Sequence, residues 1–291
     1  MQQRDIINRD KGFFTFAQNS EDTNYVRLAY VLAMSLKLSQ KTTPYLSIGI
    51  TPDTNIPKQW EWAFDNIIEI PWGDDAISTK WKLANEWKAI HMSPYAETIK
   101  LDCDMLFFKD ITQVWDSLSN TDISICNKVL SYRSDVIVSD HYRKAFTVNK
   151  LPNVYTAMTY FKKHETAYML FDIVKDIFEN WEIYSKECTV YDYRPEYPTT
   201  DVAFAIALKI LDLDSTHYTE NDVLKFVHMK SHLQGWDDTG LDENWSTHIT
   251  ALINGEFECK IGNHLQIHPL HYHIKSFITT EIIEQYERYF K

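Results

Sequence analysis

Glycine is scarce in this chain, with 7 residues among 291, whereas Tyr, Phe and Trp number 17, 15 and 9. So few glycines indicate a firm core with few wide, flexible loops, and most of the aromatic rings are expected to pack in that core. The sequence also lacks an apolar run near the roughly 20 residues that a membrane-spanning helix needs. No signal-peptide hydrophobic region follows Met1. We therefore expect a cytoplasmic protein without a transmembrane segment.

Paired cysteines and basic tracts are missing too. The four cysteines are far apart and form no Cys-x-x-Cys pair, which is typical of a reduced intracellular protein. Lys and Arg number 29 against 41 Asp and Glu, a net charge of -12, and they form no tract. A large electrostatic footprint for nucleic acid is therefore not expected, although a local basic groove remains possible.

Apolar periodicity predicts alternating strands and helices, and hence an α/β fold with a mixed, mainly parallel sheet flanked by helices. Strands are expected at 12–17, 44–50, 66–70, 98–101, 122–126, 154–161, 225–229 and 265–272. Helices are expected at 60–64, 80–91, 111–118, 165–182 and 279–289. Two more are expected with caps: 25–36 with Ser20 or Asp22 as the cap, and 202–210 with the capping segment Thr199-Thr200-Asp201, in which Asp201 is a candidate N-cap. Residues 131–149 are polar and weakly periodic, which indicates a loop-rich insertion. Without a repeat or a linker, we expect one domain over residues 1–291 with a variable carboxyl-terminal part.

Two carboxylates, Asp102 and Asp104, follow the strand predicted at 98–101. Residues i and i+2 of an extended segment point to the same face, so both carboxylates should meet at the carboxyl end of the strand, where open α/β sheets bind ligands. Asp-x-Asp is a short pattern that chance often supplies, but here it lies between two apolar stretches instead of in a solvated loop. Hard oxygen ligands favour Mg2+ or Mn2+, ions that usually carry substrate phosphates as well.

The ordered motifs resemble those of retaining GT-A glycosyltransferases of the glycogenin and lipooligosaccharide galactosyltransferase kind. The stretches that carry the resemblance are Phe14-Thr15-Phe16-Ala17, Asn24-Tyr25, Ser35-Leu36, Thr79-Lys80-Trp81 and Leu101-Asp102-Cys103-Asp104. The resemblance implies a GT-A fold that binds a nucleotide sugar, with a nucleotide-sugar half at about 12–126 and an acceptor half at about 127–291. It also implies a metal-dependent hexosyltransferase that uses a UDP-sugar donor with Mn2+ or Mg2+ and retains the configuration of the sugar.

The same resemblance assigns roles to individual residues. The residues assigned to the nucleotide sugar are Thr15, Phe16, Ala17, Asn19, Tyr25, Lys80, Asp102, Cys103 and Lys275. The residues assigned to the metal are Asp102 and Asp104 together with His271 or His273, and His228 is a competing third ligand. Asp201 and Lys80 are the expected catalytic residues: Asp201 would bind hydroxyls of the donor sugar or steady positive charge at its anomeric carbon, and Lys80 would stabilise the leaving group.

Two departures keep other functions open. The family's Asp-Gln pair is Asp201-Val202 here, and its Asn-Ala-Gly strand is matched only loosely by 153–157. A catalytically inactive module that binds nucleotide sugars is therefore an alternative. So is a nucleotidyltransferase, although such enzymes usually have a glycine-rich phosphate loop and the first strand here is followed by Gln18-Asn19-Ser20. The acceptor stays undetermined among a glycan, a lipid-linked sugar, a protein and a modified nucleic acid base.

Overall fold

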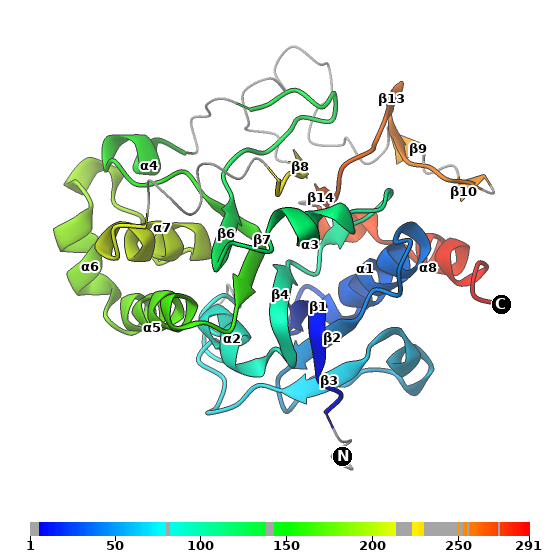
Figure 1. The fold of residues 1–291 in the computed structure, drawn as a ribbon, viewed down its shortest axis with the longest axis horizontal. Coiled ribbons are helices and arrows are strands. Elements are labelled where there is room, and N and C mark those ends of the chain that lie inside the picture. The colour runs from blue at the N-terminus through cyan, green and yellow to red at the C-terminus, as the bar shows by residue number, and fades with distance from the viewer. Residues whose placement is uncertain are drawn as a thin grey trace.

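A six-stranded sheet forms the centre of the computed structural model (Figure 1), which describes residues 6–79, 82–137, 143–213, 223–229, 249–250, 253–254, 256–272 and 274–291. Its strand order is β3-β2-β1-β4-β7-β6. The strands are β1 Arg9–Ala17, β2 Leu46–Ile50, β3 Asn66–Glu69, β4 Tyr95–Leu101, β6 Ile123–Cys126 and β7 Tyr155–Lys162. The pairs β1·β2, β2·β3 and β1·β4 are parallel, whereas β7 is antiparallel to β4 and β6. The expected mixed, mainly parallel sheet is confirmed.

Helices cover both faces of this sheet. On one face the core contains the apolar side chains of α1 Tyr25–Ser39 and α8 Thr280–Glu287. On the other face it contains those of α2 Ala89–Met92, α5 Glu165–Glu179 and α7 Thr200–Ile210. The remaining helical segments are η1 Lys58–Ala63, η2 Glu86–Lys88, α3 Gln113–Ser117, α4 Lys144–Val148, α6 Trp181–Cys188, η4 Tyr191–Tyr193 and η6 Lys275–Phe277. No helix among the described residues is both long enough and apolar enough to cross a membrane.

The cap predicted for α1 is wrong, whereas the cap of α7 lies within the predicted capping segment 199–201. Helix α1 begins at Tyr25 because the side chain of Asn24, and not Ser20 or Asp22, accepts the hydrogen bond from the Arg27 amide at 3.0 Å. Helix α7 is capped by Thr199, whose hydroxyl accepts from the Val202 amide. Asp201 therefore lies inside the first turn of α7, where its carboxylate is free to act elsewhere.

The helix predicted over residues 80–91 is also wrong. Residues 82–85 form turns, followed by the short segments η2 and α2. Asn85 explains the break, because its amide group donates to Gln18 and Asp74, both at 2.6 Å, and its carbonyl accepts from the Asp75 amide at 3.1 Å. These tertiary contacts favour a turn over the helix that the apolar spacing suggested.

Two other predicted elements are interrupted. The helix expected at 165–182 divides into α5 and α6 at Asn180, whose side chain bonds back to Asp176. The strand expected at 265–272 divides into β13 His264–Leu265 and β14 Leu270–Tyr272. Within the loop-rich region expected at 131–149, α4 is helical and residues 138–142 lie outside the described residues.

A small second sheet brings distant parts of the chain beside the end of β4. Its order is β5-β14-β8, with β5 Met105–Leu106 and β8 Val227–Met229. Strand β14 is antiparallel to β5 and parallel to β8, so His271 pairs with both Met105 and His228. Four further two-residue strands are β9 Ile249–Thr250, β10 Ile253–Asn254, β11 Glu256–Phe257 and β12 Lys260–Ile261. The sheet β5-β14-β8 is what positions the functional site.

Candidate active site

Three potential metal ligands converge where β4 ends. Asp102 and Asp104 lie in the turn between β4 and β5, and His271 comes from β14, more than 160 positions later in the chain. His271 Nε2 is 3.2 Å from Asp104 Oδ2 and 3.7 Å from Asp102 Oδ2. One ligand atom from each residue lies within 4.8 Å of the others. Two carboxylate oxygens and one imidazole nitrogen at these separations fit a single divalent cation such as Mn2+.

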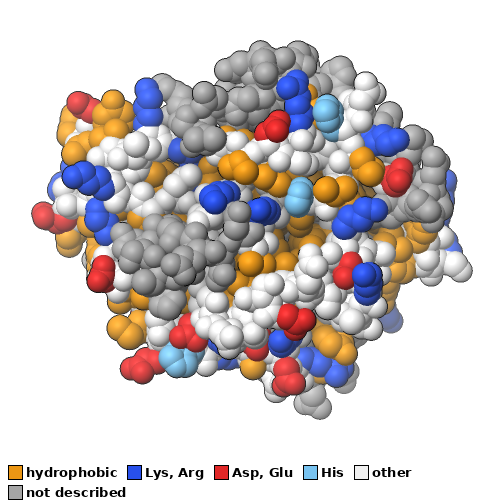
Figure 2. Space-filling model, turned by 45° about the horizontal axis from the view of Figure 1, so that its top comes forward, with side chains coloured by type: hydrophobic (Ala, Val, Ile, Leu, Met, Phe, Trp, Pro, Cys, Tyr) orange, Lys and Arg blue, Asp and Glu red, His pale blue; other side chains and the backbone are white. Residues whose placement is uncertain are grey.

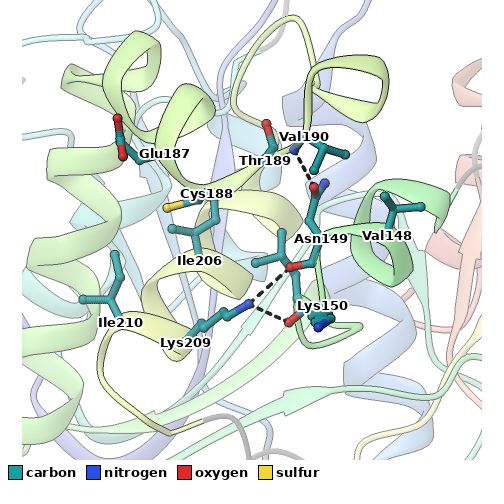
Figure 3. A pocket seen from close by; sticks show the side chains of 11 residues that line it. Val148, Asn149, Lys150, Glu187, Cys188, Thr189, Val190, Ile206, Lys209 and Ile210 are labelled. Carbon is teal, nitrogen blue, oxygen red and sulfur yellow. Dashed lines mark hydrogen bonds between the residues drawn. The ribbon is translucent and has the colours of Figure 1, made fainter.

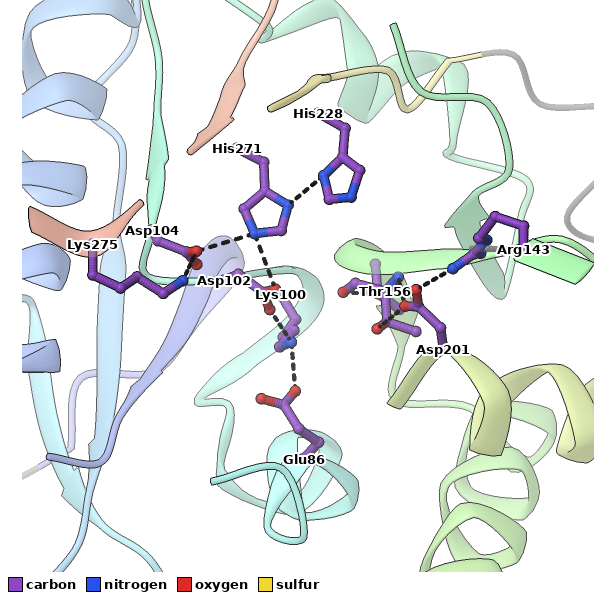
Figure 4. A network of polar contacts seen from close by, with 11 residues as sticks. Glu86, Lys100, Asp102, Asp104, Arg143, Thr156, Asp201, His228, His271 and Lys275 are labelled. Atoms are coloured by element: carbon purple, nitrogen blue, oxygen red, sulfur yellow. Dashed lines mark hydrogen bonds and ion pairs between the residues drawn. The ribbon is translucent and has the colours of Figure 1, made fainter. Parts of the chain in front are cut away.

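Lys275 lies against this triad. Its Nζ forms an ion pair with Asp104 Oδ2 (Figure 4). The Tyr272 amide donates to the Asp104 carbonyl at 3.1 Å. Burial alone would raise the pKa of Asp104, but the Lys275 ammonium and His271 hold it well below its usual range. Asp104 is therefore an anion at neutral pH, as metal binding requires.

A buried lysine fixes the other carboxylate. Lys100 Nζ is 2.8 Å from Asp102 Oδ1 and 2.5 Å from Glu86 Oε2, and its side chain is only 5% exposed. Burial raises the pKa of Glu86 to about 6 even though Lys100 acts to lower it. Burial would lower the pKa of Lys100, but Asp102 and Glu86 together raise it, so the ammonium stays charged. Glu86, Lys100 and Asp102 thus form a chain of charges that orients the Asp102 carboxylate.

His228 orients the imidazole of His271. The two Nδ1 atoms are 3.0 Å apart and the rings stack with centroids 4.9 Å apart (Figure 4). If His271 donates from Nδ1 to His228, its Nε2 is unprotonated and faces the carboxylates, which is the tautomer that binds a metal. Of the three histidines that the sequence offered as the third ligand, His271 lies in the triad and His228 contacts its ring. His273 lies outside the described residues.

Two cavities meet at the triad. The smaller, about 240 Å3, extends toward β1 and α1 and is lined by Phe16, Tyr25, Asp104 and Lys275 among others. The larger, about 840 Å3, extends toward α4, η4 and α7. Asp102 and His271 line both cavities. The triad thus lies at the junction of the two cavities.

An ion pair forms the wall of the larger cavity opposite the triad (Figure 4). Arg143 Nη1 donates to Asp201 Oδ2 at 2.7 Å, and its guanidinium lies 3.9 Å from the ring centroid of Phe146 and 4.0 Å from that of Tyr155. Asp201 Oδ1 accepts from the amide and the hydroxyl of Thr156 at 2.8 and 2.7 Å. Burial raises the pKa of Asp201, but Arg143 and Thr156 outweigh burial and lower it. Asp201 is thus a rigidly held anion facing the cavity.

The residues that the sequence analysis assigned to the nucleotide sugar fall into three groups: those that line the smaller cavity, those that do not, and one outside the described residues. Phe16, Tyr25, Asp102, Cys103 and Lys275 line the smaller cavity. The side chains of Thr15 and Ala17 are fully buried in β1, and the side chain of Asn19 accepts a hydrogen bond from the Val26 amide at 3.3 Å. Lys80 lies outside the described residues.

Several residues at the site were not predicted from the sequence. Gln18, Lys82 and Glu86 line the smaller cavity, and Lys100 contacts Asp102. Lys100 had one sequence signal: it lies two positions before Asp102 in a strand, so both side chains point to one face. Glu86 gave no such signal, because its contact with Lys100 depends on how the turn at 82–85 folds.

A separate cavity of about 470 Å3 lies between α4, α6 and the carboxyl end of α7 (Figure 3). Lys209 Nζ there donates to the carbonyls of Asn149 and Lys150 at 3.2 and 3.0 Å. Burial raises the pKa of Cys188, so its thiol stays neutral. The side chains that line this cavity are mostly apolar, and its described lining has no cluster of potential metal ligands.

The charge on the face over α4, β8 and β14 differs from that of the whole chain. Figure 2 shows lysine, arginine and histidine side chains across the middle of this face, among hydrophobic ones, whereas acidic side chains gather mainly toward its lower edge. The net charge of the chain is -12. The face thus offers local positive charge that an anionic ligand would find on an otherwise acidic protein.

Comparison with known proteins gives matches in structure alone. No family model and no curated protein sequence matches the chain. The structure of mouse xyloside xylosyltransferase 1, apo form, aligns with a TM-score of 0.54 and 13% identity over 93% of this chain and 100% of that one. The galactosyltransferase LgtC, in complex with donor and acceptor sugar analogs, aligns with a TM-score of 0.54 and 10% identity over 95% of each chain. The fold is therefore that of GT-A glycosyltransferases.

Proposed function

We propose that this protein is a divalent-metal-dependent glycosyltransferase that moves a hexose or similar sugar from a UDP-sugar to an acceptor hydroxyl. The observation that carries the proposal is the triad of Asp102, Asp104 and His271 at the junction of two cavities. Asp102 and Asp104 are too close together to flank a glycosidic bond as the two carboxylates of a hydrolase do. The GT-A fold supports transfer.

Each cavity has a role in this proposal. The smaller one holds the nucleotide, with Phe16 and Tyr25 near the base and Lys275 near the diphosphate. The larger one holds the donor sugar and the acceptor. Its rim mixes both signs of charge with aromatic rings from 192–197, which suits a neutral glycan acceptor better than a nucleic acid strand.

Asp102, Asp104 and His271 would hold the metal, which when bound supplies positive charge to the diphosphate leaving group. Lys275 adds a second cation on the same side. Asp201, which Arg143 and Thr156 hold rigidly as an anion, faces the region where positive charge develops on the sugar. Retention by attack of the acceptor from the front face is consistent with this layout, because no described side chain there stands out as a covalent nucleophile.

The cytoplasm is the proposed compartment, because the four cysteines, all among the described residues, form no disulfide and three of them are buried.

Calorimetric titration with UDP and MnCl2 tests the proposal. We expect UDP to bind only with Mn2+ present, and UDP-glucose or UDP-galactose to release UDP slowly. Asp102→Asn should weaken Mn2+-dependent binding at least about tenfold, because the amide is a poor ligand of nearly the same shape. The weakened contact with Lys100 should lower stability by only about 1 kcal/mol, so the variant stays folded. Asp116→Asn on α3 is the matched control, since it changes the same charge away from the described cavities of the site. Equal UDP binding in both variants would refute the assignment.

One observation favours a second candidate function. Val202 lines the larger cavity at the position where the family has glutamine. If transfer needs that glutamine, the protein is instead a catalytically inactive module that binds nucleotide sugars. Mn2+-dependent binding of UDP-glucose without release of UDP, with or without added oligosaccharide, would identify this second function.

A further inference from the structure

An exposed indole is held rigidly outside both cavities. Trp72 is 67% exposed, and its ring stacks on that of Trp87 with centroids 5.7 Å apart and an interplanar angle of 3°. The imidazole of His91 packs edge-on against both indoles, at 5.3 and 5.8 Å, and Tyr168 lies 5.6 Å from His91. We call these four side chains, Trp72, Trp87, His91 and Tyr168, the Trp72 platform.

The backbone of this turn is strained at Trp72. Trp72 has φ 61° and Gly73 has φ 87°, and a bulky residue in the left-handed region is a clear outlier. Burial of the indole compensates little, because most of its surface faces solvent. Such strain persists where the surroundings impose it, and it is common at ligand-binding positions.

A buried lysine imposes this conformation. The side chain of Lys88 is 0% exposed, and its Nζ donates to the Gly73 carbonyl at 2.7 Å and lies 3.0 Å from Asp75 Oδ2. The same carboxylate accepts from Trp87 Nε1 at 3.1 Å. One buried cation therefore fixes both the strained turn and the indole beneath Trp72. The result is a flat aromatic surface that is ordered before any ligand arrives.

The platform is connected to the active site. Asn85 donates to Asp74 in the platform's turn and to Gln18, which lines the smaller cavity. Trp87 directly follows Glu86, which contacts Lys100. Contacts thus join the turn of Trp72 to the lining of the smaller cavity, although Trp72 itself lies outside both cavities.

From this geometry we infer that Trp72 stacks on a pyranose ring of a glycan substrate, as a carbohydrate-binding site separate from both cavities. The C–H face of a pyranose matches a flat indole, and its hydroxyls match the polar groups at the edge, which include Asp172, 65% exposed, and Lys175, whose Nζ lies 4.9 Å from the Trp87 ring. A single indole is small beside the roughly 800 Å2 per partner of a stable protein interface. The identity of the glycan as a substrate rests on the proposed function.

Binding to immobilised maltoheptaose, cellohexaose, xylohexaose and chitohexaose, without UDP or metal, tests the inference. Wild-type protein should bind at least one of them, and Trp72→Gly should bind it about tenfold more weakly, the usual order of effect for losing one stacked aromatic ring. Trp72→Phe should keep most of the binding. Ile77→Ala is the matched control, because Ile77 is 75% exposed on the same loop, and it should bind as wild type does.

The same variants show whether the indole has a structural role instead. Glycine accepts the left-handed conformation without strain, so Trp72→Gly should unfold at the same midpoint as wild type or a higher one. A clearly lower midpoint would overturn the inference, as would equal binding by Trp72→Gly and wild type or no binding to any of the four oligosaccharides. Self-association or binding to phosphatidylcholine vesicles that disappears in Trp72→Gly would assign the platform to a second copy or to a membrane.

The transfer proposal can fail independently. Asp102→Asn should keep oligosaccharide binding and lose Mn2+-dependent UDP binding. If UDP never binds but Trp72-dependent oligosaccharide binding persists, the function proposal fails and the carbohydrate site stands.

Discussion

Replacing Lys100 with Met should destabilise the protein in a pH-dependent way. The substitution removes the ion-pair partner of Glu86, whose side chain is only 10% exposed. A buried carboxylate without its cation takes up a proton. At pH 7, about 2.5 units above its ordinary pKa of 4.5, that protonation costs at most ~3.4 kcal/mol. Breaking a buried ion pair usually costs about 3–5 kcal/mol, so we expect a loss of about 3 kcal/mol.

The sign of the pH effect follows from the raised pKa of Glu86. A carboxyl group whose pKa is higher in the folded state binds more protons there, so stability falls as pH rises from its unfolded pKa through the folded one. At pH 5 Glu86 is protonated at little cost, and the variant should lose only about 1 kcal/mol, mainly from the lost contact with Asp102. The loss should grow between pH 5 and pH 7.

Urea unfolding followed by tryptophan fluorescence at pH 5 and pH 7 measures both quantities. The double variant Lys100→Met, Glu86→Gln is the matched control, because it removes the carboxylate that needs a cation, and it should regain about 2 kcal/mol at pH 7. A loss below about 1 kcal/mol at pH 7, or the same loss at both pH values, would refute the account of this charge chain.

Two further substitutions test the supports of the site and of the sheet. His228→Ala should weaken Mn2+ binding about 10–100-fold in calorimetry, because His271 loses the partner that fixes its ring, and His228→Asn should restore part of the affinity; unchanged affinity would contradict the supporting role. Gly12→Ala should lower stability by about 3 kcal/mol in urea unfolding, since its Cβ would lie 2.4 Å from the Tyr95 ring, which is fully buried and bonded to Ser47. Gly49→Ala is its control and should cost less, because its Cβ would lie 2.9 Å from both the flexible end of Met92 and the Phe16 ring, a milder overlap than the one at 2.4 Å; an equal loss in both variants would contradict this account of the Tyr95 clash.

Local patterns predicted most of the sheet. Each strand of the six-stranded sheet appears within a few residues of its predicted position, because an apolar run between turn residues reports burial directly. The predictions over residues 80–91 and at the cap of α1 failed for a shared reason. The contacts of Asn85 with Gln18 and Asp74, and the side chain of Asn24, decide those boundaries, and apolar spacing carries no information about them.

The sequence by itself determined the carboxylates Asp102 and Asp104 and their place at the end of a buried strand. It left the third ligand open among three histidines, because their distance from Asp102 along the chain says nothing about their distance in space. The pairing of β14 with β5 and β8 decided it, by placing His271 beside the carboxylates and His228 behind it. Tertiary structure alone likewise brought Glu86 to Lys100, Arg143 to Asp201 and Lys88 to the turn of Trp72. Each of these contacts joins residues that no periodicity relates, so only the packed chain reveals them.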